Sequence, residues 1–151
     1  RFSPEVWRRP DLWPLPNVWL GVSVENQAAA EERIPLLVQT PATVRFLSCE
    51  PLLGPVDLGE FLPADFARRS AVTPSLWVIV GGESGPQHRT MDLAWLESLV
   101  NQCRAAGVAT WVKQDSGPRP GAWGRIPERL RVHEFPAYSH WRKSLGIELA
   151  V

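Results

Sequence analysis

The chain has 151 residues, of which 44% are hydrophobic and 21% are charged, a composition typical of one globular domain. Sixteen basic and sixteen acidic residues give a formal net charge of zero, so charge indicates neither a nucleic-acid partner nor an anionic membrane surface. No stretch approaches the roughly 18 to 20 apolar residues of a membrane span, and the first residues do not resemble a signal peptide, which together predict a cytoplasmic protein.

Residues 1–17 contain four prolines and predict an irregular lead-in, because proline interrupts helices. Residues 18–24 (VWLGVSV) predict the first strand. Asn26 then suits the N-cap of a helix over 27–33, which Pro35 is expected to end or kink, with a further helical turn over 36–39.

The second predicted strand covers residues 44–48 (VRFLS), and residues 52–74 read as a long loop with one helical turn near 64–69. The third strand, 76–81, is an apolar run that enters the turn GGESG and is typical of a strand buried on both faces. The loop over residues 52–74 has a length that is often associated with function.

The clearest predicted helix is 91–106, whose apolar residues form one stripe and which Gly107 can cap. Residues 109–113 (ATWVK) predict the fourth strand. Residues 118–151 are rich in proline, glycine and charge, and we expect an irregular tail packed on the barrel, with a helical turn around 127–130 and a short strand at 130–132.

The predicted strand ends near positions 24, 49, 82 and 114 are separated by about 25 to 33 residues, the size of one strand-helix unit. We therefore predict an α/β fold over residues 18–117, with four parallel strands, intervening helices and the architecture of half a TIM-like barrel. Such a half has an open sheet edge and an exposed face, so we expect self-association or pairing with a missing half.

Alternation along the strands places one aromatic residue near the start of each strand on a common face: Trp19, Phe46, Trp77 and Trp111. The same face ends in hydroxyl and charged side chains, where parallel sheets carry their chemistry. We predict catalytic roles for Glu50, Glu83 and Lys113. Ligand-binding roles are predicted for Ser23, Glu25, Asn26, Ser48, Gly81, Gly82, Ser84, Arg89 and Gln114. The structural alternative is that these residues cap helices or form salt bridges.

Other site types are less well supported. The segment 81–85 could hold a phosphate or carboxylate with its backbone amides, but it matches neither the Walker pattern nor the six-residue dinucleotide fingerprint. Cys49 and Cys103 are too far apart in sequence for a metal knuckle or a disulfide framework, and we expect two buried thiols. No three-ligand histidine spacing is present, so we predict no metal site.

Four stretches, PLPNVWLGVSVENQ, RFLSCEPLLGPVDL, WVIVGGESGPQHR and QCRAAGV with WVKQ, resemble the C-terminal half of a bacteriophage protein family of unknown function, named after phage gene products thirty-seven and sixty-eight. Full-length members are similar to radical S-adenosylmethionine enzymes, with an N-terminal three-cysteine motif for an iron-sulfur cluster and a partial βα barrel. This chain has no such motif, and it begins at Arg1 rather than methionine, so we expect a fragment or a processed chain.

The resemblance implies that this chain is the substrate- and cofactor-facing half of such an enzyme and takes a small-molecule ligand. S-adenosylmethionine and an iron-sulfur cluster are implied for the full-length protein, whereas we expect no cofactor on this chain alone. Two alternatives stay open. One is a non-catalytic remnant or binding module, and the other is a metal-assisted hydrolase built on the three glutamates.

Overall fold

The computed structural model describes residues 14–15, 17–62 and 75–136, and the structural statements below concern these residues. They form four strands, two α-helices and one short 3₁₀ helix. In chain order these are β1 (Trp19–Ser23), α1 (Gln27–Gln39), β2 (Val44–Cys49), β3 (Ser75–Gly81), α2 (Leu93–Ala106), β4 (Ala109–Gln114) and η3 (Glu128–Leu130). The four strands predicted for the parallel sheet are all present, and their ends differ from the prediction by no more than one residue.

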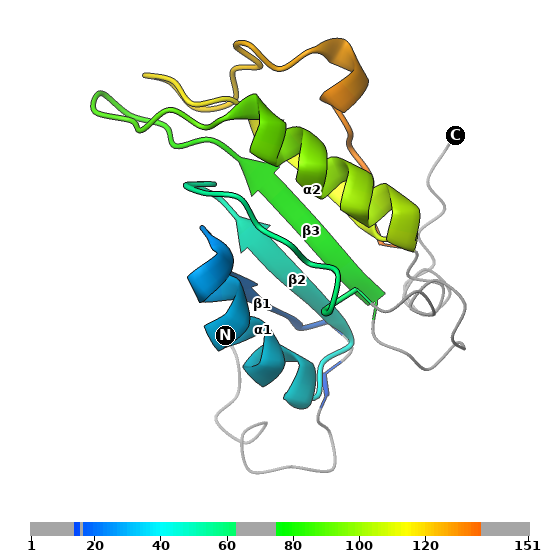
Figure 1. The fold of residues 1–151 in the computed structure, drawn as a ribbon. Helices are drawn as coiled ribbons and strands as arrows, with labels where there is room; N and C mark the ends of the chain where they lie inside the picture. The colour runs from blue at the N-terminus through cyan, green and yellow to red at the C-terminus, as the bar shows by residue number, and fades with distance from the viewer. Residues whose placement is uncertain (1–13, 16, 63–74, 137–151) are drawn as a thin grey trace.

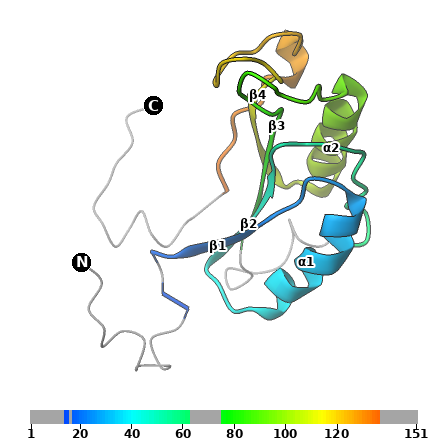
Figure 2. The ribbon, with the colours of Figure 1, turned by 90° about the vertical axis from the view of Figure 1, so that its left-hand side faces the viewer.

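The strands make one sheet in the order β1-β2-β3-β4, with every neighbouring pair parallel. Both helices lie on the same side of this sheet (Figures 1 and 2). Crossover connections between parallel strands are right-handed, so a consecutive strand order brings successive helices to one face. The predicted α/β fold with parallel strands and intervening helices is confirmed, and the half barrel stays a prediction.

The core lies between the sheet and the helices. Leu47, Val78 and Val112 point from the sheet into this layer and are buried, as are Leu96 and Leu99 of α2. The ends of α2 follow the sequence closely: Asp92 accepts a hydrogen bond from the Ala94 N–H, and Gly107 ends the helix in the left-handed conformation with φ 66°. Capping and an apolar stripe are enough to define α2.

Helix α1 differs from its prediction, because it continues through Pro35 to Gln39 as one element. The expectation that Pro35 ends the helix and a separate turn follows is wrong. Proline removes one helical hydrogen bond, but Ile34 and Leu37 on either side of it are buried against the sheet and hold the last turn in place. Arg45 of β2 also donates to the Leu37 carbonyl at 3.0 Å and to the Thr40 carbonyl at 2.8 Å, which joins the helix end to the sheet.

An irregular segment that follows β2, residues 50–62, lies against both helices and buries Leu52, Val56 and Leu58. Gln102 of α2 accepts from the Leu58 N–H at 2.7 Å and donates to the Val56 carbonyl at 3.0 Å. The segment therefore covers the part of the core that a helix between β2 and β3 would cover in a regular strand-helix-strand unit. The helical turn predicted near 64–69 lies outside the described residues.

The opposite side of the sheet, which we call the open face, carries the aromatic side chains. Trp77 lies near Trp19, Phe46 and Trp111, with ring centroids 5.8, 6.5 and 6.4 Å away. The predicted common aromatic face is confirmed. Phe135 stacks on Trp77 from the C-terminal segment, with centroids 5.3 Å apart.

The C-terminal segment also runs along the outer edge of β4. The Val112 N–H donates to the Val132 carbonyl and the Glu134 N–H donates to the Thr110 carbonyl, both at 2.8 Å. The predicted turn around 127–130 is present as η3, but the strand predicted at 130–132 is wrong. The chain leaves η3 and makes only an isolated antiparallel bridge at His133. Among the described helices, none has the length and apolar character needed to cross a membrane.

Candidate functional site

Glu50 and Lys113 form an ion pair at the carboxyl edge of the sheet. The Lys113 Nζ lies 2.9 Å from Glu50 Oε1, and their side chains are 50% and 18% exposed. Glu50 follows β2 and Lys113 belongs to β4, so the pair spans the intervening strand β3. At that point β3 has Gly81, where an added Cβ would lie 3.4 Å from Glu50 Cγ and Cδ. The Glu50 side chain therefore passes directly over Gly81, within van der Waals range of a Cβ at this position.

A change of register in the sheet sets the position of Lys113. Val80 is opposite Val112, but the next residue of β3, Gly81, is opposite Gln114. Lys113 is therefore the extra residue of a bulge and has no partner in the β3 ladder. Bulges of this kind redirect a side chain and are frequent beside functional sites.

Gln114 lies directly behind the pair but faces the interior, and it is buried. Its Nε2 donates to the Gly82 carbonyl at 2.9 Å, and its Oε1 accepts from the Gly121 N–H at 2.8 Å. Both ends of the amide are thus used to join three segments of the chain. This side chain supports the site from behind instead of being presented to a ligand.

Glu83 and Arg89 form a second, separate pair in the loop between β3 and α2. The guanidinium donates from Nε and Nη2 to the two carboxylate oxygens at 2.8 and 2.7 Å, and the Arg89 N–H adds a bond of 2.7 Å. The side-chain and backbone hydrogen bonds from Arg89 lower the pKa of Glu83 from 4.5 to about 2. Glu83 is therefore fully ionised at neutral pH and bound to a cation of its own loop.

Glu25, at the end of β1, pairs with α1. Arg33 donates from Nη1 to Glu25 Oε2 at 2.8 Å and to the Ser23 carbonyl at 2.9 Å. The pKa of Glu25 is lowered by its own backbone N–H first, and then by Arg33. The carboxylates Glu25, Glu50 and Glu83 thus bind three different cations, and two of these pairs, Glu50–Lys113 and Glu83–Arg89, join predicted site residues.

The remaining predicted ligand-binding residues have varied environments. Asn26 accepts from the Ala29 N–H at 3.0 Å and is the N-cap of α1, which matches the structural alternative. Ser23 and Ser48 are direct neighbours in the β1–β2 register, with Ser23 exposed and Ser48 half-buried. They lie on the open face beside the end of β3, where Ser48 is opposite Ile79.

The glycine-rich turn is held by its own backbone. Gly82 N–H donates to the Gln114 carbonyl at 3.0 Å, and Gly85 N–H donates to the Gly117 carbonyl at 2.9 Å. These amides are therefore not free to bind a phosphate, and the neighbouring Glu83 carboxylate adds negative charge. Ser84 is exposed and bridges to Gly117 in parallel. The geometry gives the phosphate hypothesis no support.

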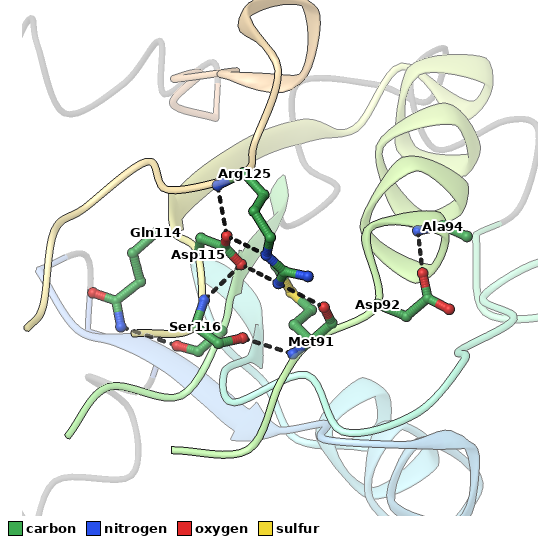
Figure 3. Close-up of polar contacts among 8 residues, drawn as sticks. Met91, Asp92, Ala94, Gln114, Asp115, Ser116 and Arg125 are labelled. Carbon is green, nitrogen blue, oxygen red and sulfur yellow. Dashed lines mark hydrogen bonds and ion pairs between the residues drawn. The ribbon is translucent and has the colours of Figure 1, made fainter. Parts of the chain in front are cut away.

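Sequence reasoning missed an ion pair between a buried Asp115 and a half-exposed Arg125 (Figure 3). The Asp115 side chain is 2% exposed. Its Oδ1 accepts from Arg125 Nη2 and the Ser116 N–H, both at 2.7 Å, and its Oδ2 accepts from the Arg125 N–H at 2.7 Å and Nε at 3.0 Å. Burial acts to raise the pKa of Asp115, but these bonds outweigh it and the pKa is lowered.

This pair fastens three parts of the chain together. Arg125 also donates to the Met91 carbonyl at 2.9 Å, and the Met91 N–H donates to Ser116 Oγ at 2.6 Å (Figure 3). Gly124 leaves space for Asp115, since an added Cβ there would lie 2.6 Å from Oδ2 and φ is +49°. The sequence signal for this pair was an aspartate directly after a strand. Its arginine partner lies ten residues later, and no spacing rule links the two.

The described residues show no group of three or more histidine, cysteine or carboxylate side chains that could hold a metal ion. Cys49 and Cys103 are both buried, as predicted. Burial raises the pKa of Cys103 to about 11 and that of Cys49 still higher, so both thiols stay protonated at neutral pH. Thiolates hold iron-sulfur clusters, and these two cysteines do not fit that role.

Comparison with known proteins gives one family. A family model described as a protein of unknown function (DUF5131) matches residues 2–133. Searches of the curated proteins and of the solved structures found no match. Since the family model covers most of the chain, this protein belongs to the DUF5131 family, whose function is unknown.

Proposed function

We propose that the carboxyl edge of this sheet is the ligand-facing part of a half barrel of the radical S-adenosylmethionine type, with Glu50 and Lys113 as the groups that contact the ligand. The observation that carries the proposal is their ion pair of 2.9 Å across Gly81. It combines opposite charges at the edge where parallel α/β sheets bind ligands.

The chemistry of the pair suits a zwitterion. The Glu50 carboxylate can accept hydrogen bonds from an ammonium group, and the Lys113 ammonium can donate to a carboxylate. A ligand with both groups replaces the internal pair by two charge-assisted contacts and leaves neither charge unpaired. The methionyl part of S-adenosylmethionine has this pair of groups, so Glu50 and Lys113 fit that part of the molecule.

The iron-sulfur cluster of that enzyme class does not fit this chain. The full sequence has two cysteines, and both are buried and protonated. In this proposal the cluster ligands belong to another polypeptide segment, and no step of chemistry is assigned here to a cluster. The residues of this chain bind the ligand, orient it and balance its charges.

The rival functions use the same residues differently. A non-catalytic remnant or binding module would keep the half-barrel shape without the chemistry. A metal-assisted hydrolase would need the three glutamates at one ion, whereas Glu25, Glu50 and Glu83 each pair with a different cation. This pairing gives the hydrolase no support.

Calorimetric titration with S-adenosylmethionine tests the proposal. We expect binding by the wild-type chain and about tenfold weaker binding by Glu50→Gln and by Lys113→Met, because each removes one charge-assisted hydrogen bond. Arg129→Met is the matched control, since it breaks an exposed ion pair to Glu97 of α2. No binding by the wild type, or equal affinity in all four proteins, would overturn the proposal and favour a remnant.

A further inference from the structure

Lys113 has no pairing partner in the parallel ladder between β3 and β4. The register passes from Val112 to Gln114, so Lys113 lies opposite no residue of β3. The direction of a bulged side chain depends on how firmly its chain neighbours are fixed. On the N-terminal side that fixing comes from the pairing of Val112 with Val80 and from its bond to Val132.

On the C-terminal side the fixing comes from two buried side chains. Gln114 connects the Gly82 carbonyl to the Gly121 N–H, and Asp115 accepts four hydrogen bonds, three of them from Arg125. The Asp115 N–H also donates to the Ala122 carbonyl at 2.9 Å. The residues directly after Lys113 are therefore joined to β3 and to the loop 121–125 (Figure 3).

We propose that Gln114 and the Asp115–Arg125 pair are positioning residues that fix the end of β4 and thereby direct Lys113 toward Glu50. This inference rests on the proposed function of the Glu50–Lys113 pair, and it names what sets the geometry of that site. None of the three residues contacts the ligand. Their role is to hold the backbone on one side of the bulge.

The physical reason lies in the cost of ordering a lysine. A partly exposed lysine loses side-chain freedom when it pairs, and the ion pair compensates for only a small part of this loss. Lys113 is half exposed, so the pair forms only if the backbone already directs the amine toward Glu50. The hydrogen bonds of the buried Gln114 and Asp115 side chains fix the backbone after Lys113, and this backbone directs the amine toward Glu50.

The chain makes this testable because it contains two lysines, Lys113 and Lys143. Acetylation with a soluble acylating reagent, followed by mass spectrometry, gives the rate at Lys113 relative to Lys143. We expect Glu50→Gln to raise the relative rate about two- to fivefold, the range for loss of a partly exposed ion pair. Asp115→Asn and Gln114→Met should each raise it by a similar factor, whereas Arg129→Met should leave it unchanged.

Combining Asp115→Asn with Glu50→Gln separates positioning from general loosening. Since the pair is already broken by Glu50→Gln, the double variant should acetylate Lys113 no faster than Glu50→Gln alone. A further increase, or an unchanged relative rate in Asp115→Asn despite a lower unfolding midpoint, overturns the inference. If Asp115→Asn does not fold, the Gln114→Met rate decides.

The readout needs no ligand, so the two proposals fail separately. Wild-type protein that does not bind S-adenosylmethionine but shows the expected acetylation rates contradicts the proposed function and retains the positioning role. Normal binding of S-adenosylmethionine with equal relative acetylation rates in all variants supports the proposed function and contradicts the positioning role.

Discussion

Burial decides what each ion pair at the carboxyl edge contributes to stability. Asp115 is almost fully buried and has four hydrogen bonds, whereas Arg129 and Glu97 form their pair on the exposed side of α2. A buried carboxylate that loses its partner cannot recover the solvation it gave up on folding. The two arginines thus offer a direct comparison between a buried and an exposed carboxylate partner.

We predict that Arg125→Ala lowers the free energy of unfolding by about 3 kcal/mol, because Asp115 stays buried without its guanidinium. Arg129→Ala should cost about 0 to 1 kcal/mol. Urea denaturation followed by tryptophan fluorescence measures both. Equal losses in the two variants would show that Asp115 is solvated once Arg125 is removed.

Glu83 is expected to make stability depend on pH. Its pKa is lowered on folding from 4.5 to about 2, so its pair with Arg89 stabilises the folded state above pH 4.5. That contribution is lost as the pH falls from 4.5 toward 2. Glu83→Gln should therefore show a smaller fall in the free energy of unfolding over this interval than the wild type.

Urea denaturation at a series of pH values measures this difference. Asp115 also has a lowered pKa and destabilises the wild type in the same direction at low pH. It is present in both proteins, so the difference between them reports Glu83. Parallel curves would mean that solvent screens the exposed Arg89 and that the pair contributes nothing to folding.

At the scale of elements, the junction of β3 and β4 depends on close backbone contact. An added Cβ at Gly82 would lie 2.2 Å from the Ser116 N and 2.7 Å from the Asp115 carbonyl carbon. These are backbone atoms that are already fixed by the Asp115–Arg125 pair, so they cannot move aside easily. At Gly117, the residue after Ser116, the nearest atom is 3.9 Å from an added Cβ.

We predict that Gly82→Ala lowers the free energy of unfolding by about 1 to 3 kcal/mol, the range for an overpacked site. Gly117→Ala should cost less, since its Cβ would be in ordinary van der Waals contact. Urea denaturation of the two variants provides the comparison. A smaller loss in Gly82→Ala than in Gly117→Ala would contradict the close contact.

At the scale of the whole molecule, the sheet has helices on one face and rings on the other. On the open face Phe135 is 62% exposed and Trp19 is 36% exposed. Exposed aromatic surface favours association. We propose that a second copy of the chain covers this face.

Sedimentation velocity at tens of micromolar should then show self-association that Phe135→Ser weakens, because it removes apolar area from the open face. Leu36→Ser is the matched control, since Leu36 has the same 62% exposure but lies on α1. A compact monomer in wild type, or equal effects of both substitutions, would contradict the proposal.

The sequence by itself determined the elements and the two faces of the sheet. Alternation in the strands placed Trp19, Phe46, Trp77 and Trp111 together, and the apolar stripe with Gly107 located α2 and its C-terminal end, because these signals depend on residues close in the chain. The continuation of α1 through Pro35 was not predictable in this way, since burial of Ile34 and Leu37 against the sheet holds it.

Only the tertiary structure decided which charged groups meet. Four strand ends predicted one polar cluster, but each carboxylate pairs with the cation nearest in space, and arginines from α1 and from the loops reach Glu25, Glu83 and Asp115. A one-residue bulge in β4 redirects Lys113, which meets Glu50 across Gly81. Such contacts join residues distant in the chain, so they depend on register and packing, which local sequence patterns do not specify.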